Sequence, residues 1–316
     1  MNLAASILEG NRLALARTLS LVENDTPQGR EALSVLFPHT GRAHIIGVTG
    51  APGTGKSSLV NQLARHFRQP LDGNQPSRVG IIAIDPTSPF TGGAILGDRI
   101  RMRALTGDPG VFIRSMASRG SLGGLSATTA AAAQLFDAAG FEIILIETVG
   151  VGQAEVEIAH LAHTTLVIEA PGLGDDIQAI KAGILEIADI LVINKSDQPG
   201  VDNAERALRS MLDLAAPRPG WIPPIQRTVA ILGTGIPELA DTIHQHRQYL
   251  SNTGEWLQRD RLRLQSELDF LLKEALVMKW RETVSDTLYK DIFKAVSERQ
   301  LSPHLAVQRL LLGDEA

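Results

Sequence analysis

Residues 50–57 read Gly50-Ala51-Pro52-Gly53-Thr54-Gly55-Lys56-Ser57, a complete Gly-x-x-x-x-Gly-Lys-Ser pattern. Glycines at this spacing let backbone N–H groups point at phosphate oxygens, with the positive end of a following helix behind them. We expect Lys56 to reach the β and γ phosphates as a point charge and Ser57 to offer its hydroxyl to Mg²⁺. The pattern follows an apolar run at 44–49 and precedes an amphipathic run at 58–67. This order predicts a phosphate-binding loop (P-loop) between a strand and a helix, and therefore nucleotide binding.

Short runs rich in Val and Ile alternate with helix-like segments along the chain. This alternation is typical of an α/β fold with a mostly parallel sheet buried on both faces. Several runs end in polar residues, namely Asp85, Glu147 and Asn194, and ligands lie outside the carboxyl ends of such strands. The predicted strands are the five strong runs at residues 44–49, 78–85, 141–148, 165–170 and 189–194, and two weaker runs at 110–115 and 224–232.

A second motif, Asn194-Lys195-Ser196-Asp197, follows the apolar residues 190–193 and indicates guanine. A carboxylate at Asp197 can accept from the guanine N1–H and amino groups, whereas adenine presents an acceptor there and would leave the charge unpaired. Asn194 is expected to brace neighbouring loops, and the stem of Lys195 to lie over the purine face. A backbone N–H for the guanine carbonyl is expected from the end of the last strand, at Thr228, Val229 or Ala230.

Magnesium bound with the nucleotide needs carboxylates, and three are suitably placed in the sequence. Asp85 closes the second predicted strand, Asp98 ends the segment 91–98, and Glu147 opens Glu147-Thr148-Val149-Gly150. The last segment has the form of a DxxG switch motif with Glu replacing Asp, so that its carboxylate would hold the ion and the Gly150 N–H would meet the γ phosphate. Each acid taken alone is more often a capping or solvated carboxylate.

The residue after the switch glycine is Val151, where Ras-like enzymes carry a glutamine that orients water. Gln153 lies further along and is not assumed to replace it. Slow intrinsic GTP hydrolysis that depends on a partner is therefore predicted.

The composition limits the remaining possibilities. The chain has 316 residues and a net charge of −5, so it has no overall positive charge to attract nucleic acid. It has no cysteine, which excludes disulfides and thiolate metal sites. It shows neither a signal peptide nor an apolar run of transmembrane length, so a cytoplasmic protein that binds no membrane is expected.

Helices are predicted for residues 1–40, followed by a G domain at 41–250 and a helical region at 251–316. Within the last region, apolar residues at helical spacing over 255–281 predict a helix that packs on its own domain or on a second copy.

Four segments together resemble the MeaB/ArgK/MMAA GTPases, and they are residues 47–57, 85–98, 147–153 and 194–197. The segment 85–98 is the most specific of them. The resemblance implies a P-loop NTPase fold with a SIMIBI-type G domain, bound GTP or GDP and Mg²⁺, and a homodimer through the C-terminal helices. It further implies a chaperone that gates adenosylcobalamin loading, protection and reactivation of a B12-dependent acyl-CoA mutase, for which methylmalonyl-CoA mutase is the first candidate. An adenosyltransferase is a further candidate partner.

The resemblance also implies roles for individual residues. It gives catalytic roles to Lys56, Glu147 and Lys181, the last in a switch III segment at 172–181 that contains Asp175 and Asp176. The metal ligands it implies are Ser57, Asp85, Asp98 and Glu147. The nucleotide-binding residues it implies are Gly50, Ala51, Pro52, Gly53, Thr54, Gly55, Lys56, Ser57, Ser58, Gly150, Asn194, Lys195 and Asp197.

Three alternatives share the fold class. A nickel-insertion GTPase would need metal ligands, and the close histidine pairs are His160 with His163 and His244 with His246. A transport-linked kinase would use ATP, and Asp197 is evidence against this because its carboxylate suits guanine and not adenine. A GTP-gated scaffold without catalysis would also suit Val151, and GTPase rates with and without a mutase would distinguish it from a timing enzyme.

Overall fold

The computed structural model describes residues 2–69, 75–86, 105, 107–118, 124–148, 150, 154–172, 186–214 and 220–312, without the side chains of residues 85–86, 117–118, 124–126, 154–156 and 312. It divides into two compact units, residues 1–263 and residues 264–316. The division into 1–40, 41–250 and 251–316 stays a prediction.

The larger unit is built on a seven-stranded sheet with the order β3-β2-β4-β1-β5-β6-β7, whose neighbouring strands all pair in parallel. The central β1 pairs with β4 from His44↔Ile143 to Val48↔Glu147. Its other neighbour is β5, paired from Ile46↔Thr164 to Gly50↔Ile168. The strands are β1 (His44–Gly50), β2 (Val79–Pro86), β3 (Val111–Ser118), β4 (Ile143–Glu147), β5 (Thr164–Glu169), β6 (Ile190–Ile193) and β7 (Ile225–Arg227).

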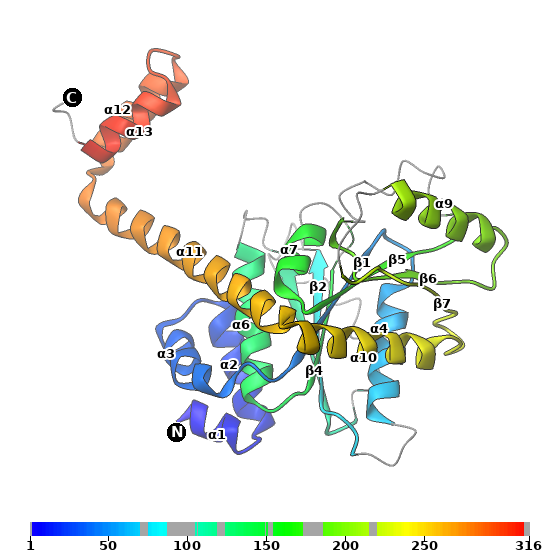
Figure 1. Cartoon of the computed structure of the whole chain (residues 1–316). Coiled ribbons are helices and arrows are strands. Elements are labelled where there is room, and N and C mark those ends of the chain that lie inside the picture. Colours follow the sequence, from blue (N-terminus) through cyan, green and yellow to red (C-terminus); the bar gives the residue numbers. More distant parts are fainter. Residues whose placement is uncertain are drawn as a thin grey trace. The chain divides into compact units, whose positions relative to one another are not determined.

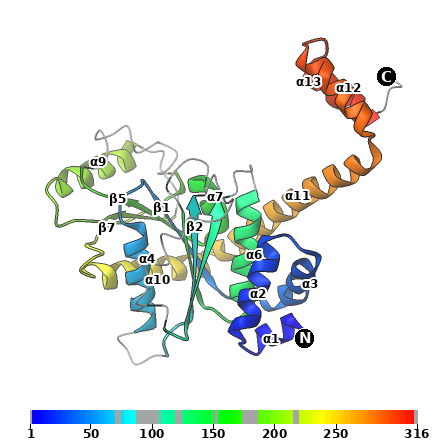
Figure 2. The same cartoon turned by 180° about the vertical axis from the view of Figure 1, so that it is seen from behind.

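Helices cover both faces of this sheet (Figures 1 and 2). Because side chains alternate along a strand, Ile81 of β2 packs in one core and Ile82 in the other. The first core is closed by α4 (Lys56–Arg68) and α10 (Ile236–Thr253). The second is closed by α6 (Gly124–Ala138) and α7 (Ala154–Leu161), together with the N-terminal α1 (Leu3–Leu8), α2 (Arg12–Glu23) and α3 (Pro27–Leu36). A smaller core lies between β5, β6 and α9 (Val201–Leu214).

Two local features explain how β1 is held in place. The buried carboxylate of Asp137 accepts backbone N–H groups from Gly41, Arg42 and Ala43, which fixes the segment between the short 3-10 helix Phe37–His39 and β1. At Gly47 a Cβ would lie 2.6 Å from Cγ1 of Ile158, so glycine at this position lets α7 pack directly on the strand.

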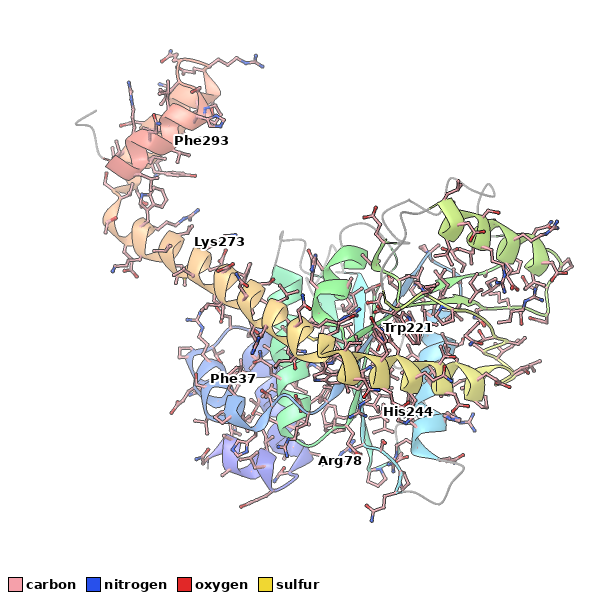
Figure 3. The ribbon with its side chains drawn as sticks, in the orientation of Figure 1. Phe37, Arg78, Trp221, His244, Lys273 and Phe293 are labelled. Atoms are coloured by element: carbon pink, nitrogen blue, oxygen red, sulfur yellow. The ribbon has the colours of Figure 1, made fainter. Side chains whose placement is uncertain are left out.

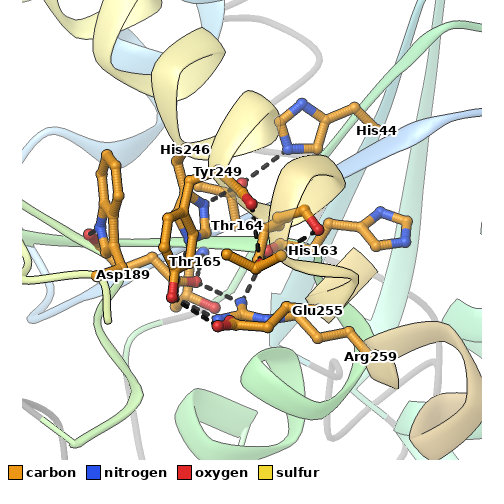
Figure 4. A network of polar contacts seen from close by, with 12 residues as sticks. His44, His163, Thr164, Thr165, Asp189, His246, Tyr249, Glu255 and Arg259 are labelled. Carbon is orange, nitrogen blue, oxygen red and sulfur yellow. Dashed lines mark hydrogen bonds and ion pairs between the residues drawn. The ribbon is translucent and has the colours of Figure 1, made fainter. Parts of the chain in front are cut away.

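At the amino edge of the sheet, a largely buried polar cluster holds the first turns of α11 (Glu255–Thr283) (Figure 4). Arg259 donates 2.8 Å hydrogen bonds to both carboxylate oxygens of Asp189 and to the carbonyl of His163. Since His163 precedes β5 and Asp189 precedes β6, one guanidinium ties the starts of two neighbouring strands to α11. We call this cluster the α11 anchor, and its members are His44, His163, Thr164, Asp189, His246, Trp256, Arg259 and Asp260.

The imidazole of His163 has its tautomer fixed by its two hydrogen bonds. Its Nδ1 accepts the backbone N–H of Ile45 at 3.0 Å, so this nitrogen carries no proton, and its Nε2 donates to Asp260 at 2.9 Å. Trp256 stacks on the ring with centroids 3.9 Å apart. Burial lowers the pKa of His163, and the carboxylate of Asp260 opposes this shift. A neutral His163 is therefore part of the native contact between the sheet and α11.

The other two imidazoles of the α11 anchor share one hydroxyl. The Thr164 hydroxyl lies 2.7 Å from Nε2 of His44 and 2.9 Å from Nδ1 of His246. Burial holds the pKa of His44 well below its usual value and lowers the pKa of His246 to about 4. All three imidazoles are consequently neutral near pH 7.

The C-terminal unit contains the rest of α11, together with α12 (Asp286–Ser297) and α13 (Pro303–Leu312). Trp280 donates its indole N–H to the carbonyl of Leu310 at 2.9 Å, and its ring lies edge-on to Tyr289. Most of the large apolar side chains of the C-terminal unit are exposed. Phe293 on α12 is one of them, and Figure 3 labels it together with Lys273 of α11. Within the described ranges, no helix combines the length and apolar character needed to cross a membrane.

Each of the seven runs predicted from sequence coincides with or overlaps a strand of this sheet, and the largest difference in length is at the last strand. The predicted run 224–232 forms a strand only at Ile225–Arg227. From Thr228 the chain turns, because Val229 pairs with Thr234 across a tight loop that contains Gly233 at φ +78°. The turn places residues 228–230 next to the loop after β6.

Candidate nucleotide site

The loop after β1 curves around the side chain of Lys56. Lys56 is buried, and its ammonium donates to the carbonyls of Gly50 at 2.8 Å and Ala51 at 3.0 Å. Gly50 has φ +140° and Gly55 has φ +95°, conformations that favour glycine. A Cβ at Gly50 would also overlap the carbonyl of Ile168 in β5. The P-loop can therefore form only with glycine at these places.

The remaining P-loop residues complete the curve. Thr54 is buried and donates its hydroxyl to the carbonyl of Ala51 at 2.9 Å, whereas Pro52 and Gly53 are exposed and Ser58 is half-buried in the first turn of α4.

The hydroxyl of Ser57 donates to the carboxylate of Glu147 at 2.6 Å. Ser57 is the second residue of α4 and Glu147 ends β4, and both side chains are buried. Gly150, at φ +78°, lies against the P-loop, since a Cβ there would come within 2.6 Å of the Lys56 ammonium. The sequence separates these groups by about ninety residues, and the fold brings them together at the carboxyl ends of β1 and β4.

Two threonines that the motifs do not use join the same two strands. Thr148 donates its backbone N–H to the carbonyl of Val48 at 3.1 Å and its hydroxyl to Thr49 at 3.0 Å. Both hydroxyl-bearing side chains are buried. Their positions directly before Gly50 and directly after Glu147 are the only signal that the sequence offers for them.

Asn194 connects the three segments that surround the expected base site. Its amide nitrogen donates to the carbonyl of Thr54 at 2.8 Å, and its amide oxygen accepts from the Thr228 hydroxyl at 3.1 Å and the Ala230 N–H at 2.9 Å. This is the bracing contact expected from the sequence. Lys195 follows with φ +57°, and Asp197 is exposed in the turn beyond it.

The backbone N–H groups expected to bind a guanine carbonyl all have partners in the structure. Those of Thr228 and Val229 donate to the backbone carbonyls of Ile193 and Thr234. That of Ala230 donates to the Asn194 side chain. A side-chain acceptor can turn away more easily than a paired backbone carbonyl, so Ala230 is the best placed of the three to donate to a ligand.

Several predicted residues lie outside the part of the chain that the structure describes. Asp98, Val151, Gln153, Asp175, Asp176 and Lys181 are among them, and for Asp85 only its backbone position in the last part of β2 is known, opposite Ala117 of β3.

The described residues suit a magnesium nucleotide. Mg²⁺ prefers hard oxygen ligands, and the Ser57 hydroxyl and Glu147 carboxylate are two such groups already in contact. Over the described ranges no group of three or more His, Cys, Asp or Glu side chains is placed to hold a metal. His163 and His246, one from each close histidine pair, have hydrogen-bond partners in the α11 anchor.

Comparisons with known proteins agree with this geometry. The family model described as "Methylmalonyl Co-A mutase-associated GTPase MeaB" matches residues 15–285. A Pyrococcus abyssi (strain GE5 / Orsay) relative named as a GTPase is 45% identical over 306 residues, 96% of this chain and 93% of that protein. A Caenorhabditis elegans protein named methylmalonic aciduria type A homolog, mitochondrial, is 32% identical over 274 residues, 79% of this chain and 66% of that protein. The crystal structure of a LAO/AO transport system kinase superposes with a TM-score of 0.72 at 26% identity, covering 99% of this chain and 97% of that one.

Proposed function

Because the chain belongs to the MeaB family of P-loop GTPases, we propose that its GTPase cycle gates the loading of adenosylcobalamin onto a B12-dependent acyl-CoA mutase. Protection and reactivation of the mutase are part of the same role, and methylmalonyl-CoA mutase is the partner we propose. The family description, which names a methylmalonyl-CoA mutase, supports this choice. An adenosyltransferase that supplies the cofactor is a second proposed partner.

The observation that carries the nucleotide chemistry is the 2.6 Å contact between Ser57 and Glu147, next to a P-loop that encloses the buried Lys56. We propose that Lys56 binds the β and γ phosphates, with the backbone of residues 50–55 around them. Ser57 and Glu147 would hold Mg²⁺, together with Asp85 and Asp98. The ion, when bound, neutralises charge on the phosphates.

For the base, we propose that Asp197 accepts both guanine donors and that Lys195 covers the purine face. Asn194 keeps the P-loop and the turn at 228–230 in register, which its three hydrogen bonds support. Gly150 would contact the γ phosphate, since it already lies beside Lys56.

Hydrolysis by the protein alone is proposed to be slow, because Val151 stands where a water-orienting glutamine would be. The mutase would then accelerate the reaction, with Lys181 coupling hydrolysis to the partner. GTP would act as a timer, and hydrolysis would mark completion of cofactor loading.

Affinity capture with the tagged chain tests the partner. The chain is incubated with GTP, GDP or no nucleotide in a lysate containing B12-dependent mutases, and bound proteins are identified by mass spectrometry. We expect a mutase to be recovered in a nucleotide-dependent manner, and the purified mutase to raise the GTPase rate. Recovery of no B12-dependent mutase in any state would contradict the proposal, and an unchanged GTPase rate would reduce it to a scaffold.

A further inference from the structure

Thr49 and Thr148 form a hydroxyl pair between the two strands that carry the phosphate and magnesium groups. Thr49 directly precedes Gly50, the first residue of the P-loop, and Thr148 directly follows Glu147. Their hydroxyl oxygens lie 3.0 Å apart, and the two side chains are 0% and 1% exposed. A buried hydroxyl that lost this partner would be left without a water molecule to replace it.

The pair extends strand pairing beyond the backbone ladder. The ladder between β1 and β4 ends at Val48↔Glu147, and the Thr148 N–H adds one further hydrogen bond to the Val48 carbonyl. Thr49 and Gly50 still pair with β5 on the other side but have no ladder partner in β4. The hydroxyl bond is thus the last link between β1 and β4 before the P-loop begins.

The other contacts between these segments involve groups that the ligand would engage. Ser57 touches Glu147, and both would turn to Mg²⁺, while Gly150 lies against Lys56 and would meet the γ phosphate. Neither threonine is among the residues assigned to GTP or Mg²⁺. The Thr49–Thr148 bond can therefore persist while the ligand-binding contacts rearrange.

We propose that Thr49 and Thr148 are positioning residues that fix the Glu147 carboxylate against the P-loop and so set the affinity of the GTP-bound protein for Mg²⁺. The inference rests on the proposed function, because it takes Glu147 as a magnesium carboxylate. The pair acts through Glu147 and touches no reacting atom.

The test uses full-length Thr148→Val, Thr49→Val and the double variant, since valine keeps the shape of threonine and removes the hydroxyl. GTP hydrolysis is followed as free Mg²⁺ is varied, and GDP binding is measured by calorimetry in EDTA. We expect each valine variant to raise the half-saturating Mg²⁺ concentration about two- to tenfold, the range for losing one hydrogen bond. GDP affinity without Mg²⁺ should stay within about twofold.

Two further variants separate positioning from general destabilisation. Thr148→Ser keeps the hydroxyl and should retain the wild-type Mg²⁺ requirement, and the double variant should match the single ones because both lose the same bond. Thr18→Val is the matched control. Thr18 lies in α2, away from the nucleotide site, and its equally buried hydroxyl donates to the Ala14 carbonyl at 2.9 Å. This control should lower the melting temperature without changing the Mg²⁺ requirement.

Glu147→Gln, measured in parallel, distinguishes the two ways of failing. If Glu147→Gln raises the Mg²⁺ requirement while both threonine variants change only the melting temperature, the positioning proposal is overturned and the magnesium assignment stands. If Glu147→Gln itself leaves the Mg²⁺ requirement unchanged, the assignment of Glu147 fails, and the positioning proposal fails with it.

Discussion

Asp197 is the exposed carboxylate on which, in the proposed function, the choice of nucleotide base depends. It follows Asn194, whose three hydrogen bonds fix the loop, and Lys195, whose positive φ turns the chain toward it. Neither of these neighbours can itself distinguish the hydrogen-bonding edge of guanine from that of adenine. Base selection is therefore expected to follow the chemistry of this one side chain.

Replacing Asp197 by asparagine should change the preferred base from guanine to xanthine. An amide can accept from xanthine N1–H and donate to its C2 carbonyl, but it faces the guanine amino group with a donor of its own. We expect GTP affinity to fall at least about a hundredfold and XTP affinity to rise, as measured by calorimetry. Asp213→Asn, an exposed change on α9, is the control and should bind GTP as the wild type does. Unchanged GTP affinity in Asp197→Asn would remove Asp197 from the base site.

At this scale the sequence indicates residues that belong to contiguous motifs, such as Lys56 and Asn194, because their function fixes their spacing. It does not indicate Thr49 and Thr148, which come together only through the parallel pairing of β1 and β4. Ala230 is one of three candidate donors named from the sequence, but its N–H partner depends on a turn at Thr228, where the sequence pattern predicts continued strand.

The α11 anchor makes the packing of α11 on the sheet dependent on neutral imidazoles. Its three histidines have pKa values lowered below 6.5, so the folded protein binds fewer protons than the unfolded chain in weak acid. Their contribution to stability is complete above about pH 6.5 and is lost as pH falls toward the lowered values. For His246, with its pKa near 4, most of this loss falls between pH 6.5 and 4.

His246→Asn should remove part of this pH dependence. Asparagine can still bond the Thr164 hydroxyl but does not titrate, while Asp189, Arg259 and Glu255 remain around it. Between pH 7.5 and 5.5, the wild type should lose about 1 kcal/mol more unfolding free energy than the variant, measured by urea denaturation. The control is His244→Asn, an exposed position on the same helix, and this variant should lose as much unfolding free energy over this pH range as the wild type. Equal losses in His246→Asn and wild type would show that His246 does not titrate on unfolding.

The strands and most helices are predictable because burial imposes periods of two and 3.6 residues on the sequence. The α11 anchor is not, since its hydrogen bonds join residues as far apart as His44 and Thr164, or Arg259 and Asp189. Nothing local marks which histidine meets which carboxylate. The helix predicted at 255–281 is confirmed by α11, which spans Glu255–Thr283. The sequence does not show which residues attach this helix to the sheet.

At the scale of the larger unit, β1, β5 and β6 each run from the α11 anchor at the amino edge of the sheet to the candidate nucleotide site at its carboxyl edge. Their amino ends begin at or next to His44, His163 and Asp189 in the α11 anchor. Their carboxyl ends lead into the P-loop, the segment beginning at residue 170, and Asn194. The candidate nucleotide site and the α11 anchor therefore lie at opposite ends of the same three strands.

The exposed apolar face of the C-terminal unit predicts self-association of the chain. Leu268 and Leu272 lie one turn apart on α11 and are more than half exposed. We expect the wild type to have twice the mass of one chain by light scattering, and the double variant Leu268→Glu with Leu272→Glu to have the mass of one chain with its GTPase activity retained. Lys273→Glu, an exposed polar change on the same helix, should leave the mass unchanged. A wild-type chain that is monomeric at high concentration would contradict a homodimer.

The positions of the three tryptophans give each unit its own optical reporter. Trp256 stacks on His163 and Trp221 lies 4.8 Å from His246 by ring centroids, whereas Trp280 lies in the C-terminal unit against Leu310. A protonated imidazole quenches indole emission efficiently, so acidification should dim the first two tryptophans and spare the third. Fluorescence of the unlabelled chain can then follow protonation of the α11 anchor through Trp221 and Trp256, with Trp280 as a constant background.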